Sequence, residues 1–191
     1  MVETFDKETK VRMQVVSADS DYVASRLLFM VGILPSAGRL ANHVIESYAK
    51  AFLWSISRGD IVKMIRDWRG NPTHDSNKIL QLICKENLLV GLDAIVSKHG
   101  NVMENFHAAY CMRYMDIFEK EVTSKLCADL GVIDVGTLDE VVSVLRKAIV
   151  LQEPSWIETP LTKILKGKAG DLGKNEREYL TRGNKYFIVK N

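Results

Sequence analysis

Hydrophobic residues recur every three to four positions along most of this chain, which is the spacing of one face of an α-helix. The first such stretch covers residues 19–34, and Ser17 or Asp19 is placed to cap its start. The second covers residues 36–57 and follows Pro35, a residue that ends one helix and suits the first turn of the next. Both stretches predict amphipathic helices.

The middle of the chain continues this helical spacing. A short amphipathic segment at 60–68 leads to the breaker "RGNPTHDS". Residues 76–98 carry two apolar bursts, which predict one interrupted helix or two short ones. Gly100 separates them from a long helical pattern at 102–126.

A fifth helix is predicted where Thr137 and Glu140 match a T-x-x-E capping box, and Pro154 ends it. Two other segments have the content of strands, "KVRMQVV" at residues 10–16 and "KYFIV" at residues 185–189. These two segments can pair as a small β-ribbon.

Together the patterns predict an all-α fold, an antiparallel bundle of four to five helices with short connections and a β-ribbon formed by the termini. Composition shifts to glycine and lysine after Pro154. We therefore divide the chain into a helical bundle at 15–152 and a basic C-terminal extension at 153–191.

Composition excludes several classes of protein. No apolar run reaches the roughly 18 residues of a membrane span, and "MVETFDKETK" lacks the apolar core of a signal peptide. The three cysteines form no C-x-x-C pair, which favours free thiols in a reducing cytoplasm. The net charge of +2 is too small to indicate nucleic acid, although the C-terminal extension alone carries +3. We expect a cytoplasmic protein without membrane contact.

One arginine interrupts an apolar helix face. In "YCMRYMD", Arg113 projects between Val102, Phe106 and Ile117, because successive residues turn by about 100° around a helix. A guanidinium does not lose its proton, so an anionic group must meet it if it is buried. That group belongs to this chain, to a second copy or to a ligand.

Three stretches resemble the HEPN domain family. The stretch "DSDYVASRLLFMVGILPSAGRLANHVIESYAKAFL" is similar to its opening helix pair, "THDSNKIL" to its H-D-L-x-x-L turn, and "YCMRYMD" to its Y-x-x-R-Y-P-D signature. The resemblance covers residues 18–150 in the family's order and spacing. The matching positions are Ala41, Val44, Ile45, Glu46, Lys50, Ala51, His74, Asp75, Tyr110, Arg113, Tyr114 and Asp116.

The resemblance implies a bundle of four or five helices that is usually dimeric. Members of the family include nucleotide binders, partners of minimal nucleotidyltransferases and metal-independent ribonucleases, often the toxins of toxin–antitoxin pairs. The ribonucleases carry R-x(4–6)-H on the last long helix. In this chain Phe118, Glu119 and Lys120 occupy the three allowed histidine positions after Arg113, which weakens the ribonuclease interpretation.

Other histidines do not restore that motif. The pair Arg69 and His74 spans "RGNPTH", whose glycine and proline prevent a helix, and Arg39 and His43 are one residue too close. His107 precedes Arg113 and lies about 120° away around the helix. The catalytic candidates are therefore Arg113, His107 and His74, without an assigned role.

Each candidate binding residue has a structural alternative. Arg113 is either a phosphate clamp or half of an ion pair with Asp116, Asp75 or Glu46. Tyr110 and Tyr114 can stack on a base, although packing in the core or an interface is favoured. The second helix carries a polar stripe that consists of Arg39, His43, Glu46 and Lys50. This stripe is either a solvated face or the border of a groove, and the solvated face is the favoured interpretation.

His74 and Asp75 are expected to order a turn, with Asp75 or Ser76 capping the next helix. A zinc site at His43 and Glu46 would need further ligands that the sequence does not supply, so we expect no metal and no cofactor. The leading hypothesis is a homodimeric subunit that binds a nucleotide, RNA or a nucleotidyltransferase-type protein. The alternative is a metal-independent ribonuclease that uses Arg113 with a histidine outside the usual position.

Overall fold

The computed structural model describes residues 5–64, 74–112, 134–157, 159–166 and 172–187. Within these ranges the chain is helical and contains no strand, so the predicted all-α fold is confirmed. The helices are α1 Lys7–Met30, α2 Leu34–Ser55, α3 Gly59–Met64, α4 Ser76–Lys85, α5 Leu92–Cys111, α7 Val135–Gln152, the 3-10 turn η3 Pro154–Ile157, α8 Pro160–Leu165 and α9 Leu172–Thr181.

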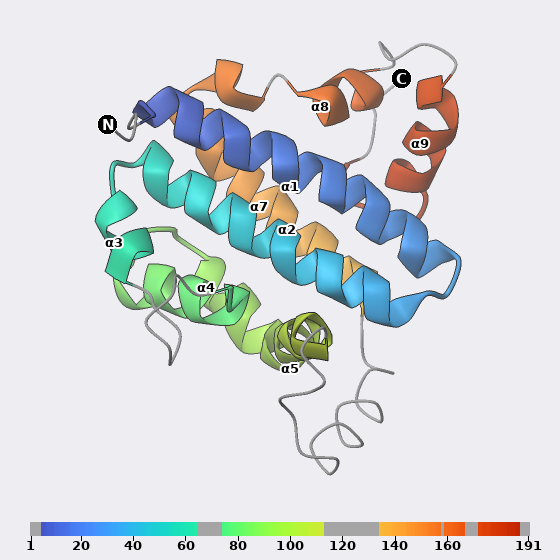
Figure 1. Cartoon of the computed structure of the whole chain (residues 1–191), viewed down its shortest axis with the longest axis horizontal. Coiled ribbons are helices and arrows are strands. Elements are labelled where there is room, and N and C mark those ends of the chain that lie inside the picture. Colours follow the sequence, from blue (N-terminus) through green and yellow to red (C-terminus); the bar gives the residue numbers. More distant parts are fainter. Residues whose placement is uncertain (1–4, 65–73, 113–133, 158, 167–171, 188–191) are drawn as a thin grey trace.

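The centre of the bundle is α2, which packs against α1, α4, α5 and α7. In Figure 1, α1 and α2 run side by side as an antiparallel pair, α7 lies behind them, and α4 and α5 lie beyond α2. The C-terminal segments η3, α8 and α9 pack on α1, on the other side of the pair. Leu161 and Leu180 from these segments belong to the same hydrophobic core as α2.

The first helix begins earlier than predicted. Asp6 caps α1 by accepting a hydrogen bond from the Thr9 N–H at 2.7 Å, so neither Ser17 nor Asp19 is the cap. Residues 10–16 lie inside α1 and cannot form half of a β-ribbon, and that prediction was wrong. A helical run outweighs strand-like alternation here because residues 10–16 place Val11 and Val15 four positions apart on one buried face.

Two other boundaries differ from their predictions. Gly100 lies within α5, which starts at Leu92 after Gly91 takes a left-handed conformation with φ of 82°. The cap of α7 is Asp134, which accepts from the N–H groups of Gly136 and Thr137, rather than Thr137 itself. The helix predicted at 102–126 can be compared with the structure only up to residue 112, because the residues that follow lie outside the described ranges.

Two buried ion pairs join α1 to α7. Asp19 of α1 pairs with Arg146 of α7, and Arg26 of α1 pairs with Asp139 of α7. The four side chains are between 2% and 6% exposed. Tyr48 of α2 contacts both members of the first pair. Because both pairs are desolvated, each charge depends on its partner.

The same ion pairs hold the C-terminal segments in place. Thr159 donates to Asp19, and Arg146 donates to the Thr162 hydroxyl at 3.0 Å. Arg26 donates to the carbonyl oxygen of Arg182 at 2.8 Å, and a further bond joins Asn184 to Tyr22, which itself donates to Asp139 at 2.6 Å. The described segments 159–166 and 172–184 are thus bound to α1 and α7 through polar contacts as well as through the core.

None of the described helices combines the length and hydrophobicity that a membrane span requires. Cys84 and Cys111 are half-buried free thiols, as the cysteine spacing predicts, and Cys127 lies outside the described residues.

We expect Arg146→Met to lower the free energy of unfolding by about 3–5 kcal/mol, because Asp19 would stay buried without its counter-charge. Urea denaturation measures this change. The control is Arg12→Met, which removes an exposed ion pair with Glu8 and should cost less than about 1 kcal/mol. Equal effects of the two substitutions would contradict the structural role given to Asp19 and Arg146.

Candidate functional site

Six polar or aromatic side chains meet where α2, α4 and α5 pack together. The residues come from α2, from the turn that begins α4 and from the last two turns of α5, and we call them the polar cluster: Glu46, Lys50, His74, Asp75, His107 and Tyr110. Five of the six were named as candidate binding or catalytic residues from the sequence. Asp75 was predicted as a helix cap and as one possible ion-pair partner of Arg113.

Hydrogen bonds from α2 position the turn that carries His74. Asn42 of α2 donates to the carbonyl oxygen of His74 at 2.8 Å and accepts from the Ser76 hydroxyl at 2.8 Å. Asp75 caps α4 by accepting from the Lys78 N–H at 3.1 Å, which confirms the predicted cap. The turn is therefore held against α2 by hydrogen bonds at His74 and at Ser76.

Glu46 is the most buried charged member of the polar cluster, with only 3% of its surface exposed. Its Oε1 atom accepts from His74 Nδ1 at 3.0 Å and also contacts the ammonium group of Lys50. Its Oε2 atom is buried and has no hydrogen-bond partner among the described residues. Of the two carboxylate oxygens, only Oε1 is therefore satisfied by the described part of the chain.

His107 of α5 faces the same cluster. Its Nε2 atom lies 3.5 Å from Cys111 Sγ and 3.8 Å from Asp75 Oδ2, while its Nδ1 atom is buried and finds no hydrogen-bond partner in the described part of the chain. Burial lowers the pKa of His107 below its usual 6.5, and the negative charges of Asp75 and Glu46 offset this only in part. The imidazole is therefore neutral at pH 7 and can accept a proton.

Three rings surround the centre of the polar cluster. The Tyr110 ring lies 5.6 Å from the His74 ring and 6.3 Å from the His107 ring, nearly parallel to the latter at 14°. Tyr110 is 7% exposed, which agrees with the favoured prediction that it packs in the core. The rings next to Tyr110 are nevertheless those of His74 and His107, the two histidines named as catalytic candidates.

Two of the buried polar atoms that lack a hydrogen-bond partner among the described residues belong to the polar cluster. In the part of the chain that the structure describes, the buried side-chain atoms without a hydrogen bond are Glu46 Oε2, His107 Nδ1 and Asn77 Oδ1. Asn77 belongs to the first turn of α4, so the three atoms come from α2, α5 and α4. Native proteins leave few such atoms, each at a cost of about 1–3 kcal/mol. The two unsatisfied atoms of Glu46 and His107 therefore distinguish the polar cluster from the rest of the described core.

Packing covers only part of the polar stripe predicted on the second helix. Glu46 and Lys50 are covered by neighbouring segments, so the interpretation as a solvated face was wrong for these two residues. Arg39 is exposed, as that interpretation expects. His43 points to α1, where its Nδ1 lies 2.5 Å from Asp21 Oδ2, away from the polar cluster.

Three predicted residues, Arg113, Tyr114 and Asp116, lie outside the described residues. Asn77 was not anticipated, because an asparagine in a first helical turn has an ordinary role there and no sequence signal distinguishes this one. The described residues contain no group of three or more histidine, cysteine, aspartate or glutamate side chains arranged to hold a metal ion.

Comparisons with protein-family models, with curated proteins and with solved structures find no significant match to this chain.

We expect the free energy of unfolding to fall as pH drops from about 6.5 through the lowered pKa of His107. In that window the unfolded chain binds a proton that the folded protein does not, so acid favours unfolding. The substitution His107→Gln should reduce this dependence. Urea denaturation of both proteins between about pH 5 and about pH 8 measures the difference. If the two proteins showed the same dependence of stability on pH, His107 would have the same pKa in the folded and the unfolded state, and the prediction would be wrong.

Proposed function

We propose that this chain is a HEPN-type binding subunit whose polar cluster takes a nucleotide, either free or within RNA. The observation that carries the proposal is the unpartnered Oε2 atom of Glu46, a side chain 97% buried. An ionised carboxylate oxygen accepts hydrogen bonds only, so its missing partner is a donor.

A nucleobase supplies that kind of donor. Its amino and imino groups are donors that a carboxylate oxygen can accept, whereas a phosphate placed there would be repelled by the carboxylate. The rings of His74, His107 and Tyr110 offer faces on which a base can stack. Lys50 and Lys78 carry the positive charge that a phosphate requires nearby, and Arg113 remains the predicted phosphate clamp.

The HEPN resemblance supports this proposal. Glu46, Lys50, His74, Asp75 and Tyr110 are among the residues that carry the resemblance, and they are also members of the polar cluster. By the same resemblance we propose a cytoplasmic homodimer and a nucleotidyltransferase-type protein as a further partner.

Glu46→Gln should weaken nucleotide binding by about tenfold or more, because it replaces an anionic acceptor and can turn a donor toward the base. Isothermal titration calorimetry with a panel of mono-, di- and triphosphates of the four common nucleosides measures the effect. The matched control is Glu140→Gln, since Glu140 also accepts from a histidine, His99, at 2.8 Å and from a lysine but lies outside the polar cluster.

The absence of heat with every nucleotide at about millimolar concentration would contradict the proposal, and so would equal affinities of the two variants. Retention of the circular dichroism spectrum and of the melting temperature shows that each variant is folded.

A second function, metal-independent RNA cleavage, is favoured by one specific observation. Two imidazoles, His74 and His107, flank Tyr110 in the same cluster, and burial lowers the pKa of His107. A neutral His107 can take the proton of a ribose 2′-hydroxyl, and His74, which bonds to Glu46, is the second imidazole available for proton transfer to the leaving oxygen. Arg113 would then stabilise the charge that develops on phosphorus.

If the chain cleaves RNA, activity should persist with a chelator and rise with pH through the lowered pKa of His107. His107→Gln and Arg113→Ala should each reduce the rate by about 100-fold or more. Cleavage of a labelled oligoribonucleotide measures both. His43→Gln is the control, because His43 faces Asp21 instead. Full dependence on a divalent metal would exclude this function.

A further inference from the structure

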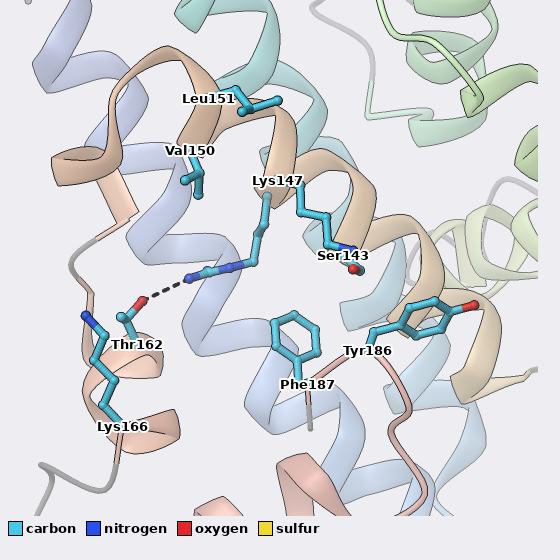
Figure 2. Close-up of a pocket in the computed structure, with 9 residues that line it drawn as sticks. Ser143, Lys147, Val150, Leu151, Thr162, Lys166, Tyr186 and Phe187 are labelled. Atoms are coloured by element: carbon cyan, nitrogen blue, oxygen red, sulfur yellow. Dashed lines mark hydrogen bonds between the residues drawn. The ribbon is translucent and has the colours of Figure 1, made fainter. Parts of the chain in front are cut away.

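A pocket of about 550 Å³ lies on another side of the bundle from the polar cluster. Helix α7 forms one wall, Thr162 and Lys166 of the α8 segment form a second, and the turn after α9 contributes Tyr186 and Phe187 (Figure 2). No member of the polar cluster lines it. The pocket exists because the C-terminal segments dock beside α7 without filling the space between them.

The walls of the pocket are largely hydrocarbon. Val150 and Leu151 of α7 face the rings of Tyr186 and Phe187, and Leu151 is 83% exposed. The Phe187 ring packs 5.6 Å from Tyr22, while Lys185 lies 4.9 Å from the Tyr186 ring centroid. Both rings are therefore held by neighbours, and the apolar surface between them and α7 stays accessible.

The charges around this pocket all have one sign. Arg146, Lys147 and Lys166 line it, and no aspartate or glutamate does so among the described residues. Asp19 neutralises Arg146 from the interior. Lys147 and Lys166 are exposed, stand on different walls and form no ion pair within the described parts of the chain. Figure 2 shows the ammonium group of Lys147 next to Ser143 and that of Lys166 on the side of Thr162, so an anionic group at either end of the pocket would meet one ammonium group.

An apolar interior with a basic mouth selects a particular ligand chemistry. Nucleotides and sugars need many polar partners, but the pocket offers few beyond the hydroxyls of Ser143 and Thr162, the latter bound to Arg146. We propose that this pocket binds an amphipathic carboxylate of the medium-chain fatty acid class. The carboxylate pairs with Lys147 or with Lys166 at the rim, and the hydrocarbon chain lies against Val150, Leu151 and Phe187. This inference is independent of the function proposed for the polar cluster.

Calorimetry of the full chain with hexanoate, octanoate and decanoate tests the proposal. We expect one site per chain and an affinity that rises about fourfold for each CH₂ group that becomes buried. The double variant Lys147→Met with Lys166→Met should bind decanoate about fivefold more weakly or worse. Lys163→Met is the matched control, because Lys163 is an exposed lysine of the same helix α8 that does not line the pocket.

Two further measurements separate the apolar and the charged contributions. Val150→Trp should abolish binding by filling the pocket, and its circular dichroism spectrum shows whether it folds. Decanol and decyltrimethylammonium should bind the unsubstituted protein more weakly than decanoate. The proposal is overturned if decanoate produces no heat at about millimolar concentration. It is also overturned if decanol binds as tightly as decanoate, or if the Lys163 variant loses as much affinity as the double variant.

Discussion

The register of this bundle depends on two buried ion pairs of opposite orientation. Asp19 and Arg26 are seven residues apart on α1, as are Asp139 and Arg146 on α7, and the helices run antiparallel so that each acid meets a base. A shift that aligned Arg26 with Arg146 would bury two like charges together. Charges that cannot reach water therefore specify one alignment of α1 with α7, and Tyr22 and Tyr48 strengthen it.

This alignment divides the surroundings of α2 into two regions with different chemistry. The side that faces α1 and α7 is closed by the ion pairs and the core, and the C-terminal segments are bound to the same charges. The side that faces α4 and α5 contains the polar cluster, where Glu46 and His107 each keep an unsatisfied atom. Saturated polar groups thus build the scaffold, while unsatisfied ones distinguish the candidate site from it.

Errors in the prediction of individual residues have a common cause. Asp19 was taken for a helix cap because aspartate is frequent there, whereas its partner is Arg146, 127 residues away. Glu46 and Lys50 matched a solvated helix pair, but their neighbour His74 comes from a turn that only packing brings to α2. For each of these residues the neighbouring sequence matched a common helical pattern, whereas the partner that determines its role lies far away in the sequence.

By itself the sequence determined the all-α class and the approximate positions of most helices, and it named five of the six residues of the polar cluster as candidates. These features follow from spacing within a few turns and from short motifs, since helix formation and capping depend on near neighbours. Tertiary structure alone decided which histidines meet Glu46, which acid neutralises Arg146, and that a pocket remains beside α7. Burial and the pairing of charges depend on how helices pack, and the order of residues along one chain does not specify that packing directly.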